Sequence, residues 1–500
     1  MKITLIYPNV GNIPSYSFGL GIIAANLKNN GHEILGICIN AESASDIDLE
    51  KIEKEVREFG PELIGFSSVS NQYKFVQLVA KYLKERIPDA KILVGGIHAT
   101  IMPEEVMAES YIDLVCRGEG EEALLELVNR MEKGEDIFAV KNICLKKDNG
   151  IIKNGMRPII EDLDSLPYAD RSLFGFGEML KEKRGWVNIL AGRGCPFLCN
   201  YCVNHYYRKL HNGKNLVRLR SVENILGEIE LIEKDHDIAM LNFTDDTFTI
   251  RKSWTLEFCE KYSKKFQYPF ACNARATHFD KELAVALKKA GCEELKIGLE
   301  SGSRRVRSEV LNREMSNEQI ETAFKVAADE GLRTWSFNMI GMPSETQNDL
   351  LETVKLNAKI RPYILRCSIL FPYQGTKLYE RCVKEDLINE ESRHKYASYF
   401  DGSILKLKHL SEADILRYKA LFKWYVDAYS AIESAEEYKS LIKKFEALPA
   451  EEWLNGEAQK KYNFEDEVID SKLKELKKEH YSSRSHLDLN YSEKTNWELP

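Results

Sequence analysis

Three cysteines lie close together near the middle of this chain of 500 residues. Cys195, Cys199 and Cys202 follow a C-x-x-x-C-x-x-C spacing, which predicts three thiolates on one tight loop. A structural zinc site has four ligands, whereas an iron–sulfur cluster held by three cysteines leaves one iron open to a small molecule. The spacing therefore predicts a 4Fe-4S cluster with one reactive iron.

The motif resembles the signature of the radical S-adenosylmethionine (SAM) superfamily, which places the aromatic Tyr201, directly before the last cysteine, among the SAM-binding residues. The resemblance implies that SAM chelates the open iron and that its reductive cleavage yields a deoxyadenosyl radical. It also implies an electron donor such as flavodoxin or ferredoxin. The alternative is a zinc knuckle completed by His205 or His211, although Cys/His zinc sites usually bring their ligands in two separated pairs.

The composition is that of a soluble globular protein with more than one domain. The chain has 70 basic and 78 acidic residues, and no strongly basic block indicates a nucleic-acid partner. Eleven cysteines without a secretion signal predict free thiols and metal ligation in a reducing cytosol, not a disulfide framework. No apolar stretch reaches the length of a transmembrane helix. We therefore expect a cytoplasmic protein.

The N-terminal third alternates short apolar runs with helix-length amphipathic segments, which predicts a doubly wound parallel sheet, a Rossmann-like α/β fold. The predicted strands cover residues 3–7, 33–39, 63–67, 91–95 and 113–116. Ligands of such sheets lie beyond the carboxyl ends of the strands. The candidate binding residues at those ends are Asn9, Ser67, Ser68, Gly95, Gly96, Gly118, Glu119 and Gly120.

Two glycine-rich turns stand out among these strand ends. Gly95-Gly96 and Gly118-Glu119-Gly120 allow close backbone approach and offer amides to a phosphate or an amide side arm. Ahead of the cysteine motif, these turns resemble the cobalamin-binding domain of the cobalamin-dependent radical SAM enzymes. The mutase-type D-x-H-x-x-G loop is missing after the first strand, so we expect His98 to be an ordinary loop histidine. The resemblance implies base-off cobalamin without a His ligand.

A cobalamin-free, flavodoxin-like domain of the methylthiotransferase kind is the alternative for this region. Such a domain carries three further cysteines for a second cluster. Here Cys38 lies inside a predicted strand, Cys116 ends the fifth strand and Cys144 falls in a later hairpin. This scatter does not match three loops that converge on one cluster, and no all-β tail follows.

Turn and proline signals divide the remainder of the chain. We predict a cobalamin-binding domain over residues 1–136, a linker over 137–180 and a radical SAM core over 181–380. In the core, strands near 186–191, 238–243, 269–273, 294–298, 334–340 and 364–371 alternate with helices, which predicts a partial (β/α)6 TIM-like barrel with its chemistry at the C-terminal rim. The predicted helices include 222–234, 253–264, 281–290, 317–330 and 345–360.

The first rim motifs resemble SAM-binding segments of the superfamily. Asp245 and Asp246 follow the second strand of the core, and their carboxylates suit the ammonium group of SAM. Arg275 follows the third strand and could form two parallel hydrogen bonds to the SAM carboxylate. The local alternatives are a helix N-cap for the aspartates and an exposed position for the arginine.

The later rim motifs continue this order. Glu300 and Ser301 belong to a Gly-Leu-Glu-Ser-Gly-Ser segment, and the resemblance makes them candidates for the ribose or amino-acid end of SAM. Gly341 lies in a turn that resembles the segment packed against adenine, although a proline-started helix with Glu345 in its first turn explains the same residues. Residues 372–379 resemble the closing P-x-x-G-T-x-L-Y segment.

Beyond about residue 381 the strand pattern ends. Residues 413–429 predict an aromatic-rich helix, and the charged last fifty residues predict a frayed helix and a loose tail. We expect residues 381–500 to form a helical region associated with the substrate.

The resemblance implies a methyltransferase that methylates an unactivated carbon of a small molecule or lipid, through methylcobalamin and a deoxyadenosyl radical. It assigns no catalytic side chain. One alternative is a cyclase or oxidoreductase similar to the anaerobic porphyrin-ester cyclases. Another is a cobalamin-binding sensor without catalysis.

Overall fold

The computed structural model describes residues 1–12, 14–147, 150–214, 216–395 and 402–475, with the backbone alone for 393–395 and 474. The chain separates into two compact units. The first comprises Met1–Pro196 and Val203–Ile238, and the second comprises Phe197–Cys202 and Ala239–Pro500. Each unit is described by itself.

The first unit contains a sheet whose strands run in the order β2-β1-β3-β4-β5-β6-β7. The strands are β1 (Lys2–Val10), β2 (Glu33–Ala41), β3 (Leu63–Ser67), β4 (Lys91–Gly95), β5 (Leu114–Cys116), β6 (Ile143–Lys147) and β7 (Gly150–Lys153). Strands β1 to β5 are parallel, which confirms the predicted fold class. Strands β6 and β7 are antiparallel and extend the sheet into the stretch that we predicted to be a linker.

Helices accompany this sheet. They are α1 (Phe18–Asn29), α2 (Leu49–Phe59), α3 (Tyr73–Arg86), α4 (Gly96–Ile101), α5 (Pro103–Ala108), α6 (Glu121–Glu132), α7 (Phe176–Glu182), α8 (Asn204–Leu210) and α9 (Val222–Asp235). Local chemistry fixes their ends: the Ser17 side chain accepts a hydrogen bond from the Leu20 amide at the start of α1, and Gly60 ends α2 with φ +68°. Buried Ile, Val and Phe side chains of the strands pack with residues of α2, α3, α4 and α5 into one core.

His98 lies in helix α4, so the expectation of a loop histidine is wrong. A glycine turn leads straight into a short helix here. The imidazole is buried and stacks at 4.1 Å on the ring of Tyr73, and its Nδ1 lies 3.2 Å from the hydroxyl of Ser70. Burial lowers the pKa of His98 to about 4, which keeps the ring neutral.

A short ribbon of the first unit leads into the cysteine loop. It follows β8 (Trp186–Ile189) and pairs β9 (Gly192–Arg193) antiparallel with β10 (Arg218–Leu219). Gly194 has φ +85°, and a Cβ atom there would lie 2.3 Å from the carbonyl oxygen of Leu216. Only glycine fits at this point, so the backbone before Cys195 has little freedom.

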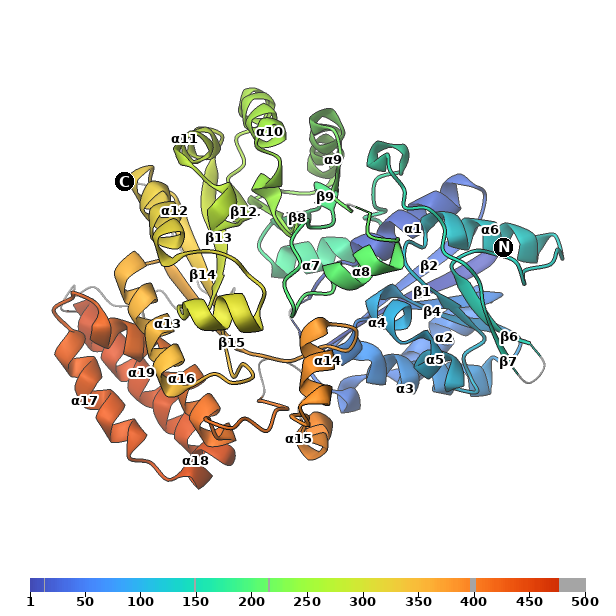
Figure 1. Cartoon of the computed structure of the whole chain (residues 1–500). Helices are drawn as coiled ribbons and strands as arrows, with labels where there is room; N and C mark the ends of the chain where they lie inside the picture. The colour runs from blue at the N-terminus through green and yellow to red at the C-terminus, as the bar shows by residue number, and fades with distance from the viewer. Residues whose placement is uncertain (13, 148–149, 215, 396–401, 476–500) are drawn as a thin grey trace. The chain divides into compact units, whose positions relative to one another are not determined.

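In the second unit, parallel strands follow one another in the order β15-β14-β13-β12-β11. They are β11 (Met240–Phe243), β12 (Phe270–Ala274), β13 (Cys292–Glu300), β14 (Arg333–Ile340) and β15 (Ile364–Ile369). Helices α10 (Lys252–Lys265), α11 (Lys281–Lys289), α12 (Asn317–Asp329) and α13 (Gln347–Ile360) alternate with them and lie on one side of the strands (Figure 1). The predicted partial TIM-like barrel is confirmed.

Helix α13 begins at Gln347, so the interpretation of Glu345 as a first-turn residue is wrong. Thr346 is the N-cap and accepts a hydrogen bond from the Asp349 amide. The Glu345 carboxylate instead accepts hydrogen bonds from the backbone amides of Gly341 (2.6 Å) and Met342 (3.0 Å). Glu345 thus closes the turn after β14.

The C-terminal region is helical, as predicted. Its helices are α14 (Lys377–Lys384), α15 (Glu390–Lys395), α16 (Glu412–Tyr429), α17 (Ala435–Glu446), α18 (Ala450–Leu454) and α19 (Glu457–Glu475). The aromatic residues of α16 are largely core: Trp424 is fully buried and packs against Phe445 and Tyr462. Most of the predicted loose tail lies outside the described residues. Among the described residues, no helix is both long and apolar enough to cross a bilayer.

Candidate functional site

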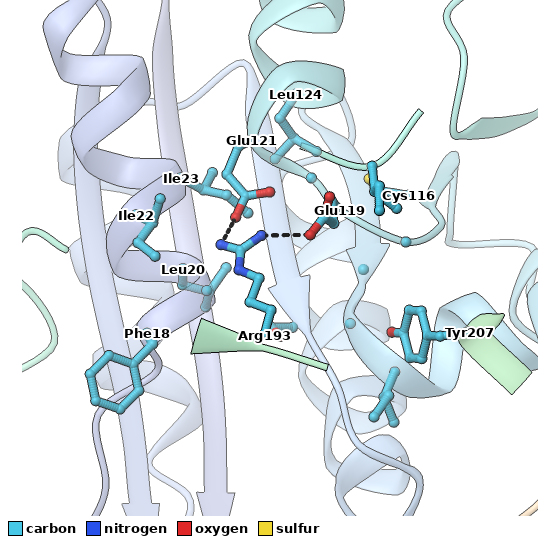
Figure 2. A pocket seen from close by; sticks show the side chains of 18 of the residues that line it. Phe18, Leu20, Ile22, Ile23, Cys116, Glu119, Glu121, Leu124, Arg193 and Tyr207 are labelled. Atoms are coloured by element: carbon cyan, nitrogen blue, oxygen red, sulfur yellow. Dashed lines mark hydrogen bonds and ion pairs between the residues drawn. The ribbon is translucent and has the colours of Figure 1, made fainter. Parts of the chain in front are cut away.

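A cavity of about 500 Å³ lies in the first unit, next to the carboxyl ends of β3, β4 and β5 (Figure 2). Most of its wall is apolar, with Phe18, Leu20, Ile22 and Ile23 contributed by α1. Six of the predicted binding residues line it, namely Ser67, Gly95, Gly96, Gly118, Glu119 and Gly120. The structure therefore brings the two glycine turns to one cavity, as expected for a sheet of this type.

Two glycines in the wall, Gly96 and Gly118, have a left-handed backbone conformation, and Gly96 also lies close to a neighbouring backbone. Gly96 has φ +87°, and a Cβ atom there would lie 2.7 Å from both the amide nitrogen and the carbonyl oxygen of Ser68. Gly118 has φ +71°, and its Cβ would lie 2.7 Å from the methyl group of Met156. An apolar cavity with a wall of bare backbone fits a bulky cofactor with amide side arms, such as cobalamin.

Two predicted residues, Asn9 and Ser68, are not among the lining residues. The Asn9 amide donates to Asn40 Oδ1 (2.8 Å), and its oxygen accepts from the Ser15 hydroxyl (3.2 Å). Ser68 is buried, and its backbone is hydrogen-bonded to Gly95 (3.0 Å) and His98 (3.1 Å). Both residues support the strand ends without facing the cavity.

Arg193 and Arg218 also line this cavity, and the sequence analysis missed them. Arg193 Nη1 donates to Glu119 (2.8 Å), and its Nη2 donates to Glu121 (2.5 Å), as the dashed lines in Figure 2 show. Arg218 donates to the same Glu119 carboxylate (2.9 Å) and to the carbonyl oxygen of Ile160 (2.7 Å). The one available signal was the position of Arg193, two residues before Cys195.

These contacts fix the charge of Glu119. Burial acts to raise the pKa of this carboxyl, but the charges of Arg193 and Arg218 hold the pKa below its usual value. Helix α8, which follows the cysteine loop, adds Asn204 and Tyr207 to the lining, and His211 at its C-cap also lines the cavity. Segments on both sides of the cysteine loop thus form part of the cavity wall.

In the second unit, two arginines contact the thiol of Cys199, which is buried. The sulfur lies 3.8 Å from Arg275 Nη1 and 3.7 Å from Arg313 Nη1. The Phe197 ring stacks on the Arg275 guanidinium, with Cζ 3.9 Å from the ring centroid. Two cationic donors thus converge on one sulfur. The cationic environment therefore fits a cluster ligand.

Tyr201 and Glu300 complete this group. The Tyr201 hydroxyl donates to Glu300 Oε1 (3.1 Å) and accepts from Arg313 (3.3 Å). Burial raises the pKa of Glu300, although Arg313 and Tyr201 favour the ionised form. Arg313 also donates to the Gly298 carbonyl (2.6 Å), where a Cβ atom would lie 2.4 Å from Glu300 Oε1.

The backbone of Glu300 has φ +68°, a left-handed conformation that is rare for this residue type. Such strain concentrates at functional sites. Arg313 was missed by the sequence analysis because it lies in an irregular segment after the π-helix Val306–Val310, away from any strand end. The structure thus brings Tyr201, Arg275 and Glu300 of the predicted SAM site together around Cys199, with Arg313 added. We call these five residues the Cys199 group.

The other predicted SAM residues have different surroundings. Asp245 is buried and Asp246 is exposed, and the Asn273 amide donates to the Asp245 carbonyl (2.7 Å). Ser301 is fully buried, with its hydroxyl 3.3 Å from that of Thr353 on α13. Gly341 has φ +81° and donates its amide to Glu345. The roles of these residues toward SAM stay predictions.

The cluster ligands likewise stay a prediction from the cysteine spacing. Cys195 belongs to the first unit, whereas Cys199 and Cys202 belong to the second. Among the described residues, no group of three or more His, Cys, Asp or Glu side chains is gathered as a metal site, which applies equally to the zinc alternative. All eleven cysteines are described, and none forms a disulfide.

Two family models match the chain. The B12 binding domain matches residues 12–128, and the Radical SAM superfamily matches residues 189–356. The first range holds the glycine-walled strand ends, and the second holds the cysteine motif and the Cys199 group. The prediction of a radical SAM enzyme is confirmed.

The chain is similar to proteins of this kind along most of its length. It is 28% identical to an uncharacterized methyltransferase of Pyrococcus horikoshii, over 86% of this chain and 92% of that protein. It is 26% identical to the anaerobic magnesium-protoporphyrin IX monomethyl ester cyclase of Rubrivivax gelatinosus, over 76% and 70% of the two chains. Its fold is similar to that of the cobalamin-dependent S-adenosylmethionine radical enzyme OxsB, solved with aqua-cobalamin and S-adenosylmethionine, with TM-score 0.67, 16% identity and coverage of 94% and 72%. The chain thus consists of a B12-binding domain followed by a radical SAM domain, the domain order of the cobalamin-dependent radical SAM enzymes.

Proposed function

We propose that this chain is a cobalamin-dependent radical SAM methyltransferase that methylates an unactivated carbon of a small molecule or lipid. The observation that carries the proposal is the presence, in one chain, of a glycine-walled apolar cavity in the B12-binding domain and a buried Cys199 held by two arginines in the radical SAM domain. The name of the Pyrococcus relative supports the methyltransferase class.

Each cofactor has candidate residues in this chain. Cys195, Cys199 and Cys202 would hold a 4Fe-4S cluster, and the wall made by Gly95, Gly96, Gly118 and Gly120 would hold cobalamin. When bound, the cluster with SAM would supply a deoxyadenosyl radical for hydrogen abstraction, and cobalamin would supply the methyl group.

The protein's own contribution is binding and orientation. Arg275 and Arg313 contact the sulfur of Cys199 and hold it in place, and Glu300 offers a buried carboxylate to the ammonium or ribose of SAM. The side chains of α1 give the cavity in the first unit an apolar wall beside the predicted cofactor site. An electron donor such as flavodoxin or ferredoxin would supply the reducing electron.

SAM with an isotopically labelled methyl group tests the proposal. Anaerobically reconstituted protein, a chemical reductant and a cell extract lacking the gene product should yield deoxyadenosine together with a labelled product. Mass spectrometry would detect that product as a species one methylene heavier than its precursor. Labelled product supports methylation.

A cyclase or oxidoreductase is the second candidate, favoured by the similarity to the Rubrivivax cyclase. Deoxyadenosine without label in any product would favour this candidate. Cobalamin binding without SAM cleavage would favour a sensor. Stoichiometric zinc at the cysteine motif in oxygen-free protein would contradict both enzyme candidates.

A further inference from the structure

One carboxylate oxygen in the cavity wall has no hydrogen-bond partner. Glu121 lines the cavity at the start of α6 and is 3% exposed. Its Oε1 accepts from Arg193 (2.5 Å), but its Oε2 is buried and receives no hydrogen bond from the described residues. A buried charged oxygen left unsatisfied is costly, so this atom indicates a donor that comes from a ligand.

The neighbouring arginines, Arg193 and Arg218, donate hydrogen bonds to atoms other than Glu121 Oε2. Arg193 divides its guanidinium between Glu121 and Glu119, and Arg218 binds Glu119 and the Ile160 carbonyl (Figure 2 shows the Arg193 contacts). Glu119 also accepts the Ile160 amide (2.9 Å). The side chains nearest to Glu121 thus leave its Oε2 to accept one more N–H or O–H.

Charge indicates that this donor is neutral. Two arginines and two glutamates form the network, so its charges balance without a further ion. A ligand carboxylate next to Glu121 would be repelled, and a ligand cation would leave an excess positive charge in an apolar cavity. A primary amide satisfies both conditions because it donates without carrying charge.

We propose that Glu121 accepts a hydrogen bond from an amide side arm of the corrin ring, and that it thereby selects amidated corrinoids over side-arm acids. Arg193 is the positioning residue that holds Glu121 in place. The inference rests on the proposed function, in which this cavity holds cobalamin. It adds a specificity-determining side chain to a wall that is mostly apolar.

Corrinoid titration tests the inference. Full-length protein is titrated anaerobically with hydroxocobalamin and with its monocarboxylates, in each of which one side-arm amide is hydrolysed, and the corrin absorbance is followed. We expect wild type to bind at least one monocarboxylate about ten times more weakly than hydroxocobalamin. In Glu121→Gln this ratio should fall close to one, because a glutamine amide can donate to an acid and accept from an amide. Arg193→Lys, which cannot hold two carboxylates in one fork, should give an intermediate ratio.

Glu122, on the same helix α6, and its partner Arg157 provide matched controls. Glu122 is exposed, does not line the cavity, and pairs with Arg157, which divides its guanidinium between Glu122 and Glu126. Glu122→Gln and Arg157→Gln should keep the wild-type ratio. A wild type that binds every monocarboxylate as tightly as hydroxocobalamin overturns the inference without any variant, as does a folded Glu121→Gln with the wild-type ratio. A wild type that binds no corrinoid overturns the proposed function as well.

Discussion

The cavity of the first unit and the Cys199 group of the second unit are built from opposite materials. The cavity wall is apolar side chains and bare backbone, with one charge-balanced network of Arg193, Arg218, Glu119 and Glu121. The Cys199 group is a set of buried polar contacts converging on Arg313. We therefore expect the cavity to be disrupted when a backbone position gains a side chain. The Cys199 group should instead be disrupted when it loses a charged side chain.

Loss of the Cys199 thiol should have the largest effect. In Cys199→Ser we expect cluster assembly and SAM cleavage to fall below detection, because the hydroxyl is a poor ligand for iron and both arginines lose the sulfur that they contact. Iron and sulfide content after anaerobic reconstitution, together with deoxyadenosine formation, measures this.

Cys38→Ser is the control for this variant, because Cys38 lies on β2, outside the motif. It should keep the wild-type iron content. A Cys199→Ser protein with a full complement of iron would contradict the prediction that Cys199 is a cluster ligand.

Arg313→Gln should have the next largest effect. It leaves the Glu300 carboxylate buried without its cation, so the free energy of unfolding should fall by about 3 kcal/mol in urea denaturation. Arg304→Gln, at an exposed position nearby, should change stability little. Equal losses in the two variants would contradict the buried-charge description.

Gly96→Ala addresses the first unit. Because φ is +87° and the added Cβ would collide with the Ser68 backbone, the free energy of unfolding should fall by more than about 1 kcal/mol. Corrin absorbance after cofactor loading should fall as well. Gly155→Ala, where no heavy atom lies within 4 Å of the new Cβ, is the control. Normal stability and corrin binding in Gly96→Ala would contradict the expectation that an added side chain at this backbone position disrupts the cavity.

The smallest effect concerns pH. Burial raises the pKa of Glu345 to about 8 from 4.5, so the folded protein binds this proton more tightly than the unfolded chain does. The stabilisation is complete below about pH 4.5 and is lost as the pH rises through about 8. The free energy of unfolding should therefore decline between these values by up to about 1.4 kcal/mol per pH unit from this group.

Glu345→Gln should remove the contribution of this group to the decline of the free energy of unfolding with pH. Urea denaturation of wild type and Glu345→Gln at pH 6 and pH 7.5 measures the difference, with Glu352→Gln on helix α13 as the control. If the free energy of unfolding varied with pH in the same way in wild type and Glu345→Gln, burial of Glu345 would not contribute to the pH dependence of stability.

The sequence predicted the elements that carry strong periodic signals. Strands β3 and β4 have the predicted bounds, and the glycine turns after β4 and β5 lie in one cavity because parallel strands end at the same edge. Helix α13 was placed two residues early because a proline and a glutamate imitate a helix start, whereas the Glu345 carboxylate closes a turn.

Long-range contacts were beyond prediction from one sequence. Arg313 reaches Cys199 across 114 positions, and Arg193 reaches Glu119 across 74. Apart from the position of Arg193 beside the cysteine motif, no local pattern distinguishes these arginines from exposed ones, since only folding brings them to a buried carboxylate or thiol. Asn9 and Ser68 lie at strand ends but not in the cavity lining, because a polar residue there can also form hydrogen bonds within the protein, and their role toward cobalamin stays a prediction.

The placement of the remaining cysteines has a practical consequence for handling the protein. Seven of the eight cysteines outside the motif have a pKa that burial raises, and they are Cys38, Cys116, Cys144, Cys259, Cys292, Cys367 and Cys382. Since only the deprotonated sulfur reacts readily, an alkylating reagent at neutral pH should modify these seven cysteines very slowly. Peptide mapping of the half-buried Cys195 and Cys202 could then report, in crude preparations, what fraction of molecules has lost its inorganic centre.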